Sequence, residues 1–118
     1  MKEDQKPKGK INISPGAIAT IAYQAAIESY GVVGLASKNL VDGITHLLVK
    51  DPTHGIEVKY EDNQIYIDIY IVVEYGTRIK SVATSVANTV RFHVEKSLGL
   101  PISEINVHVQ GLRISNPD

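Results

Sequence analysis

The chain has 118 residues, 12 of them basic and 13 acidic, with a formal net charge of -1 and no cysteine. This length corresponds to one domain with its own hydrophobic core, and the lack of cysteine excludes disulfides and thiolate metal sites. The near-neutral charge, without a basic stripe, argues against a protein that binds nucleic acid mainly through phosphates.

The N-terminal segment is charged and predicts a flexible tail over residues 1–9, followed by a single domain over residues 10–114 and a short tail over 115–118. The sequence contains neither the apolar run of a signal peptide nor a stretch long enough for a membrane span. We therefore expect a soluble, cytoplasmic protein without direct membrane insertion, which reaches a membrane only through a partner.

The first predicted elements are a short strand at residues 10–13 and a helix over about residues 15–29. Ser14 has the residue type of an N-cap, and the proline that follows it is favoured at the first helical position. Gly31 is expected to adopt a left-handed conformation after the helix, before a short apolar strand at residues 32–35. The apolar face of the helix is formed by Ile18, Ile21, Ala22 and Ala25.

The middle of the chain predicts a β-hairpin. Residues 36–54 are apolar enough for a short helix or a packed loop, and residues 51–55 have the composition of a turn. Apolar and polar residues then alternate over 56–60 and, after a turn at 61–64, over 65–74. Alternation of this length predicts a strand with one buried face.

A second long helix is predicted from Arg78 to about Leu98, with Thr77 as its cap and Gly99 just after its end. A last strand follows at residues 105–110, with its odd-numbered apolar side chains on one face. The apolar stripe of the second helix is expected to consist of Ile79, Val82, Ala83, Val86, Val90 and Val94.

The predicted order of elements is therefore β-α-β-β-β-α-β. Two amphipathic helices and a mainly antiparallel sheet with one apolar face predict an α+β two-layer sandwich, with both helices packed on one face of the sheet. The other face of the sheet is expected to be polar.

Several segments, taken in order, resemble a known family. They are Gly9-Lys10-Ile11-Asn12-Ile13-Ser14-Pro15, Gly31-Val32-Val33-Gly34, Tyr75-Gly76-Thr77-Arg78-Ile79, Val82-Ala83-Thr84-Ser85-Val86 and, above all, Asn106-Val107-His108-Val109-Gln110-Gly111. Together they resemble the alkaline shock protein family of Gram-positive bacteria, also called the envelope stress response family, over about residues 9–114.

The resemblance implies a small, non-enzymatic, cytoplasmic protein without cofactors. Members of the family are abundant and are linked to cell-envelope homeostasis and general stress. Some self-assemble, and some are held at the membrane by an anchored partner that carries a related domain. We therefore expect a homo-oligomer whose other partner is a membrane-anchored protein with a related domain.

The residues offer little for catalysis or metal binding. Glu57 and Asp68 are predicted neighbours on the polar sheet face, where two carboxylates are more often solvated than used as an acid and a base. A pocket under residues 37–54, lined by His46 or His54, is the remaining route to a small-molecule site. The histidines lack the close spacing of metal ligands; they are His46, His54, His93 and His108.

Two features leave a single-stranded nucleic-acid-binding module as the alternative function. Residues 31–34 have the Gly-x-x-Gly spacing of a KH loop, but their central valines favour a helix end followed by a buried strand. Tyrosines on the polar sheet face resemble those that stack bases in RNA-binding sheets, but acidic side chains share that face. Nucleic acid is therefore not the expected partner.

Uncharged surfaces favour protein contact instead. Opposite its apolar stripe, the second helix carries small uncharged residues and the only phenylalanine, which either anchors another protein or folds onto the loop before the last strand. The candidate interface residues on this helix are Ser81, Thr84, Ser85, Asn88 and Phe92.

Two further candidate surfaces carry aromatic residues. Tyr66, Tyr70 and His108 are predicted on the polar sheet face, where tyrosine offers a large contact area with a polar tip. Tyr23, Ile27 and Tyr30 lie away from the apolar stripe of the first helix, so either residues 37–54 or another subunit is expected to cover this side.

Overall fold

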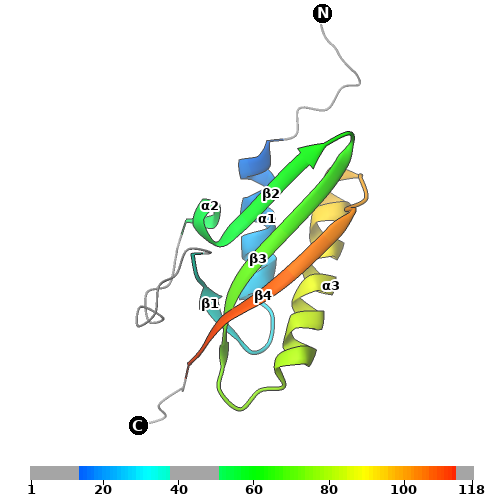
Figure 1. The fold of residues 1–118 in the computed structure, drawn as a ribbon. Coiled ribbons are helices and arrows are strands. Elements are labelled where there is room, and N and C mark those ends of the chain that lie inside the picture. Colours follow the sequence, from blue (N-terminus) through cyan, green and yellow to red (C-terminus); the bar gives the residue numbers. More distant parts are fainter. Residues whose placement is uncertain (1–13, 38–50, 114–118) are drawn as a thin grey trace, which may run out of the picture.

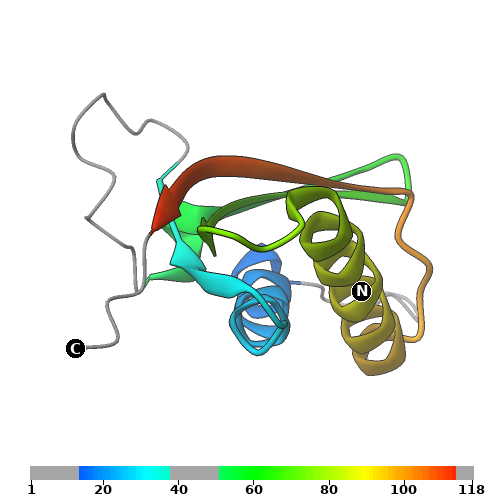
Figure 2. The same ribbon diagram turned by 90° about the horizontal axis from the view of Figure 1, so that it is seen from below.

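Two long helices lie side by side on one face of a four-stranded sheet, as Figure 2 shows from below. The computed structural model describes residues 14–37 and 51–113, and it confirms the predicted α+β two-layer sandwich. The predicted strand at residues 10–13 and the two predicted tails lie outside the described residues.

The sheet is organised around β3 (Gln64–Glu74), which runs through its centre (Figure 1). Along one edge, β3 pairs antiparallel first with β2 (Ile56–Glu61) and then with β1 (Val32–Leu35). Along its other edge it pairs in parallel with β4 (Glu104–Arg113). Parallel neighbours need a crossover connection, and α3 (Ile79–Leu98) supplies it.

A two-residue turn joins β2 to β3 and sets their register. Asp62 and Asn63 both have positive φ, 54° and 62°, which is the conformation of a type I′ turn and one that Asp and Asn tolerate. Glu61 therefore faces Gln64 at the end of the hairpin. The predicted hairpin is confirmed, with its turn narrowed to two residues.

The core lies between β3 and the helices. The odd-numbered isoleucines of β3, from Ile65 to Ile71, are at most 1% exposed. Each fully buried isoleucine contributes about 1.5–3 kcal/mol, whereas an exposed ion pair contributes about 0–1 kcal/mol. The helix-facing side of β3 therefore stabilises the fold more than its polar side does. From α3, the core receives Val82, Val86, Val90 and Val94.

Two predicted details of α3 are wrong. Thr77 does not cap the helix, because its Oγ1 donates to the carbonyl oxygen of Glu74 at 2.6 Å and closes the turn after β3. Arg78 is the N-cap residue and makes no side-chain cap hydrogen bond. Ile79 is not a core residue but is 41% exposed, because it lies in the first turn, where residues 78–81 are all exposed.

The helix α1 (Pro15–Ile27) starts as predicted and ends two residues early, and Ser14 Oγ accepts a hydrogen bond from the Ala17 N–H at 3.3 Å. A one-turn helix, α2 (Pro52–Gly55), replaces the predicted turn. Its N-cap carboxylate, Asp51, accepts from the Thr53 N–H at 3.0 Å, and this bond lowers the pKa of Asp51 below its usual value. Residues 38–50, predicted as a helix or loop, lie outside the described residues.

Substitution of two glycines with positive φ separates the energetic cost of backbone strain from the cost of disturbed packing. Gly31 has φ 87°, and an added Cβ would lie 2.7 Å from Cγ2 of Val82. Gly99 has φ 73°, and no atom of the described residues lies within 4 Å of an added Cβ there. We expect Gly99→Ala to cost only the left-handed penalty of about 1–2 kcal/mol, and Gly31→Ala to cost about 1–3 kcal/mol more because Val82 must repack. Urea denaturation measures both free energies of unfolding, and equal losses would contradict this packing.

Candidate interaction surfaces

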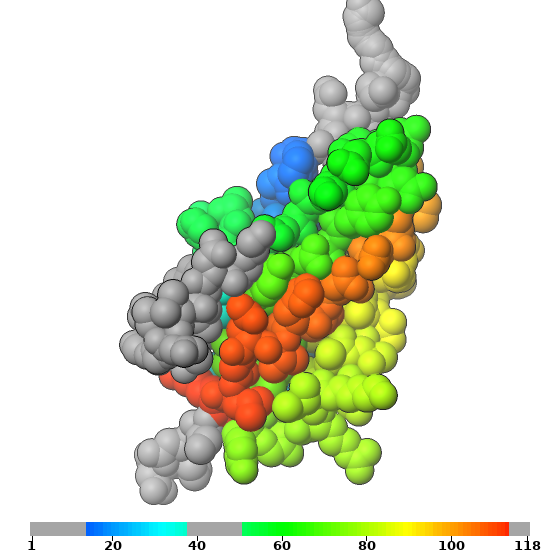
Figure 3. Space-filling view, viewed as in Figure 1, coloured from blue at the N-terminus to red at the C-terminus, as the bar shows by residue number. Residues whose placement is uncertain are grey.

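The face of the sheet opposite the helices, here called the outer sheet face, is turned toward the viewer in Figure 3. It carries polar and aromatic side chains. Side chains alternate between the two faces along each strand. The predicted residues Tyr66, Tyr70 and His108 all belong to this face and are exposed or half-buried. The same alternation adds Glu57, Lys59, Asp68 and Asn106.

Four of these side chains form a connected sheet-face cluster. The rings of Tyr70 and His108 stack with their centroids 4.6 Å apart and an angle of 14° between their planes. His108 Nε2 lies 3.0 Å from Asp68 Oδ1, and the Tyr70 hydroxyl donates to Glu57 Oε1 at 3.5 Å. Glu57 and Asp68 oppose each other across β2 and β3, which brings two carboxylates side by side. The His108 imidazole gives one of them, Asp68, a polar partner.

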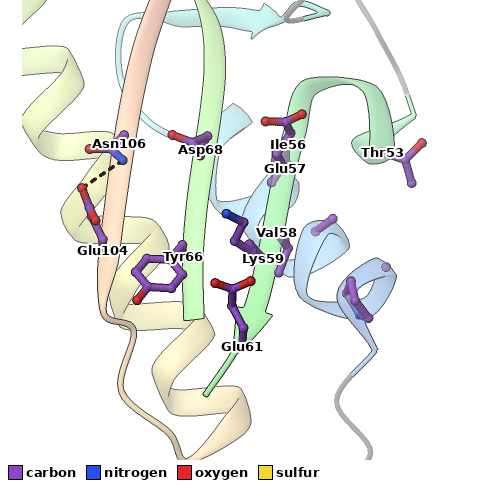
Figure 4. Close-up of a pocket in the computed structure, with 13 residues that line it drawn as sticks. Thr53, Ile56, Glu57, Val58, Lys59, Glu61, Tyr66, Asp68, Glu104 and Asn106 are labelled. Carbon is purple, nitrogen blue, oxygen red and sulfur yellow. Dashed lines mark hydrogen bonds between the residues drawn. The ribbon is translucent and has the colours of Figure 1, made fainter. Parts of the chain in front are cut away.

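An open hollow of about 800 Å³ extends from the outer sheet face around β2 to the start of α1. Figure 4 shows Lys59 among the carboxylates of its sheet-side wall, and Asn106 hydrogen-bonded to Glu104. An acidic wall repels phosphate and therefore does not suit nucleic acid. The carboxylates of this wall are those of Glu57, Glu61, Asp68 and Glu104.

The described histidines do not converge on one site. His54 lies in α2 beside Asp51, His93 lies on α3, and His108 belongs to the sheet-face cluster. Within residues 14–37 and 51–113, no group of three or more His, Cys, Asp or Glu side chains is placed to hold a metal ion. His46, the other histidine expected in a pocket under residues 37–54, lies outside the described residues.

The helix α3 exposes the uncharged surface that its sequence predicts. Phe92 is 58% exposed, and its ring contacts residues of its own helix: the His93 ring edge-on at 5.3 Å and Lys96 Nζ at 5.6 Å. The ring is therefore exposed on the helix, and its role as an anchor for another protein stays a prediction. The α3 surface consists of Ser81, Thr84, Ser85, Asn88 and Phe92, all exposed.

The first helix is covered more fully than predicted. Tyr23 and Ile27 are half-buried and pack against the core. The exposed aromatic residue of this region is instead Tyr30, 83% exposed beyond the end of α1. Tyr30 borders a hollow of about 400 Å³ together with Ser81 and Ser85 of the α3 surface. The sequence places Tyr30 away from the apolar stripe together with Tyr23 and Ile27, but of the three only Tyr30 is exposed.

Residues 31–34 do not form a nucleic-acid-binding loop. Gly31 ends the helical region, and Val32 and Gly34 pair with β3 as part of β1. The segment is therefore a helix end followed by a strand, as its apolar residues favoured.

The family model of the alkaline shock proteins matches residues 3–114 of this chain. This family is described as having a cell envelope-related function. The chain belongs to this family. The resemblance drawn from the sequence motifs is thereby confirmed over almost the whole chain.

Relatives of similar length support the same assignment. The chain is 45% identical over 111 residues to the uncharacterized protein YloU of Bacillus subtilis, and the match covers 92% of each chain. It is 38% identical over 108 residues to the uncharacterized protein Spy1614 of Streptococcus pyogenes, covering 90% of this chain and 89% of that protein.

Solved structures with a similar fold are distant in sequence. A MamM CTD variant has a TM-score of 0.57 at 15% identity, covering 84% of this chain and 94% of that chain. A copper form of MamM CTD has a TM-score of 0.51 at 17% identity, covering 86% and 90%. At this identity the likeness concerns the fold alone.

Among the described helices of this family member, none is long and apolar enough to cross a membrane.

We expect the sheet-face cluster to contribute little to the free energy of unfolding, and the stacking part of this contribution can be measured apart from the Asp68 contact. His108→Ala removes both the Tyr70 stack and the Asp68 contact, and we expect a loss of about 1–2 kcal/mol. His108→Phe keeps the ring and should recover the stacking part, because Asp68 is partly solvated and its contact contributes little. Urea denaturation of both variants measures this. A His108→Phe loss as large as that of His108→Ala would contradict the dominance of stacking.

Proposed function

We propose that this protein is a non-enzymatic interaction module of the cell envelope, which self-associates and docks onto a membrane-anchored protein that carries a related domain. The family assignment supports the envelope role. The observation that carries the proposal is the α3 surface, an uncharged helix face with an exposed phenylalanine.

The composition of the α3 surface supports a docking role. A solvated helix face is usually rich in lysine and glutamate. Here the exposed residues that precede Phe92 on this face are serine, threonine and asparagine, and the charged group at its ring is Lys96. A partner that covers this face therefore strips water from few charged groups. Aromatic residues ringed by contacts that contribute little energy themselves are typical of the energetically dominant positions in protein interfaces.

The outer sheet face supports protein contact over nucleic acid. Tyr66 lies among four carboxylates and one lysine along the hollow, and the Tyr70 hydroxyl donates to one of these carboxylates, Glu57. A base-stacking sheet needs cations for the phosphates instead. A protein with basic side chains fits this face better. We assign Tyr66, Tyr70 and His108 to this second contact surface, and Tyr23 and Ile27 to the supporting flank of α1.

Self-association through the α3 surface is tested by light scattering coupled to size-exclusion chromatography over a range of concentrations. We expect the wild type to form oligomers, and Phe92→Ala to raise the dissociation constant by about tenfold or more, because a central aromatic anchor contributes about 1.4 kcal/mol or more. Tyr75→Ala is the matched control, since Tyr75 is an equally exposed aromatic residue, 63% against 58%, off this surface.

A strictly monomeric wild type at high concentration, with Phe92→Ala behaving identically, would remove self-association from the proposal.

Docking is tested separately by chemical cross-linking in native cells and mass spectrometry of the membrane fraction. We expect a membrane-anchored protein with a related domain to be cross-linked to the wild type and to Tyr75→Ala, and less to Phe92→Ala. Salt-dependent binding of single-stranded RNA instead would favour the nucleic-acid alternative.

A further inference from the structure

The outer edge of β4 is the longest unpaired strand edge of the described sheet. β4 pairs with β3 along one side, and no described strand pairs with its other side. Exposed edges are usually protected by lysine, proline or a bulge, because free N–H and C=O groups recruit other strands. From Glu104 to Val109 the strand has neither lysine nor proline, and its register shift lies only beyond Val109.

The direction of the backbone groups on this edge follows from four hydrogen bonds. The odd-numbered residues of β3 bond toward β4, as Ser103 N–H donates to the Ile65 carbonyl at 2.8 Å and Tyr75 N–H to the Arg113 carbonyl at 2.7 Å. The even-numbered residues bond toward β1: Ala36 N–H donates to the Tyr70 carbonyl at 3.0 Å, and Glu74 N–H to the Gly31 carbonyl at 2.9 Å.

The register between β3 and β4 then places the free groups. Ile67 pairs with Ile105, and in a parallel ladder a residue bonds to the two neighbours of its partner. The backbone groups of Asn106 and its even-numbered neighbours therefore face β3. Those of Ile105, Val107 and Val109 face outward.

The same three residues leave an incompletely covered apolar strip. Their side chains lie on the helix-facing side of the sheet but are only half-buried, whereas the facing isoleucines of β3 are at most 1% exposed. The edge therefore offers free hydrogen-bonding groups and apolar side chains at the same residues, Ile105, Val107 and Val109.

We infer that β4 pairs antiparallel with β4 of a second copy of this chain about a two-fold axis at Val107, which joins the two sheets into one. This inference rests on the self-association proposed above and names a surface for it that differs from the α3 surface. In this register Val107 faces its own copy and Ile105 faces Val109, so all three outward-facing residues form hydrogen-bonded pairs. On the outer sheet face, the same register places Asn106 opposite His108 of the second copy.

The register is self-complementary in charge and in shape. Glu104 falls opposite Gln110, so no pair of like charges is opposed. On the helix side, α3 packs against β4, and Arg91 marks its flank toward the loop before that strand, since Arg91 Nη1 donates to the Ile102 carbonyl at 2.8 Å. The two α3 helices would approach each other along this flank. Ala87 and Thr84 lie one and two turns before Arg91 on that flank, and such small residues permit close helix packing.

Proline substitution tests the edge in the full chain. Val107→Pro removes an N–H that faces outward and so should leave the monomer folded, while it raises the dissociation constant of the assembly by about ten- to hundredfold through lost hydrogen bonds. Asn106→Pro is the matched control, because its N–H faces β3 and its loss should lower the thermal stability of the monomer. Light scattering and circular dichroism measure the two effects.

Cysteine cross-linking provides the second measurement, which holds even if Val107→Pro fails to fold. The chain has no cysteine, so Val107→Cys carries a single thiol, and the Cα atoms of a facing hydrogen-bonded pair lie about 5.5 Å apart, within the range of a disulfide. We expect Val107→Cys to form a disulfide-linked dimer under mild oxidation. Leu112→Cys, exposed on the same strand but far from its copy in this register, should not.

The outcomes separate the two proposals. An assembly that persists in Val107→Pro, without a Val107→Cys cross-link but with sensitivity to Phe92→Ala, overturns the β4 pairing and leaves self-association in place. A wild type that stays monomeric at every concentration overturns self-association itself and the β4 pairing with it. A cross-linked Val107→Cys dimer together with a weakened Val107→Pro assembly establishes the pairing.

Discussion

The alternation of side chains along β3 is the constraint on which the rest of the structure depends. Its odd-numbered isoleucines are at most 1% exposed and require a helix layer, while its even-numbered residues form the polar cluster on the other face. A shift of register by one residue would exchange the two faces. The type I′ turn at Asp62–Asn63 prevents this shift on the β2 side, and the parallel ladder with β4 does so on the other.

Much of this arrangement could be read from local patterns. The two long helices, the hairpin and the last strand follow from periodicity and from the caps at Ser14 and Gly99, because these signals act within a few residues. Thr77 and Ile79 could not be placed in this way. The hydroxyl of Thr77 bonds a carbonyl at the end of β3, and Ile79 has the right helical position but lies in an exposed first turn. Both depend on contacts between elements that periodicity does not report.

The candidate surfaces show the same division between local and tertiary information. The polarity of the α3 surface and of the outer sheet face is a property of single elements and was predicted with its residues. The half-burial of Tyr23, the exposure of Tyr30 and the free edge of β4 depend on which elements are neighbours. The edge in particular exists because β4 joins the sheet in parallel through α3, which places the connection on the helix side and leaves the outer side of the strand without a partner among the described strands.

The separation of these surfaces constrains how the module can assemble. Pairing of β4 about a two-fold axis is isologous, so it uses the edge completely and closes at two subunits. Growth beyond a dimer then needs another surface. The α3 surface is centred on Phe92 and shares only Thr84 with the flank on which Arg91 lies. A module with both contacts can therefore build either a closed dimer that presents two Phe92 surfaces to anchored partners, or a chain in which the two contacts alternate. Which of the two forms is populated depends on whether an anchored partner occupies Phe92 more tightly than a further copy does.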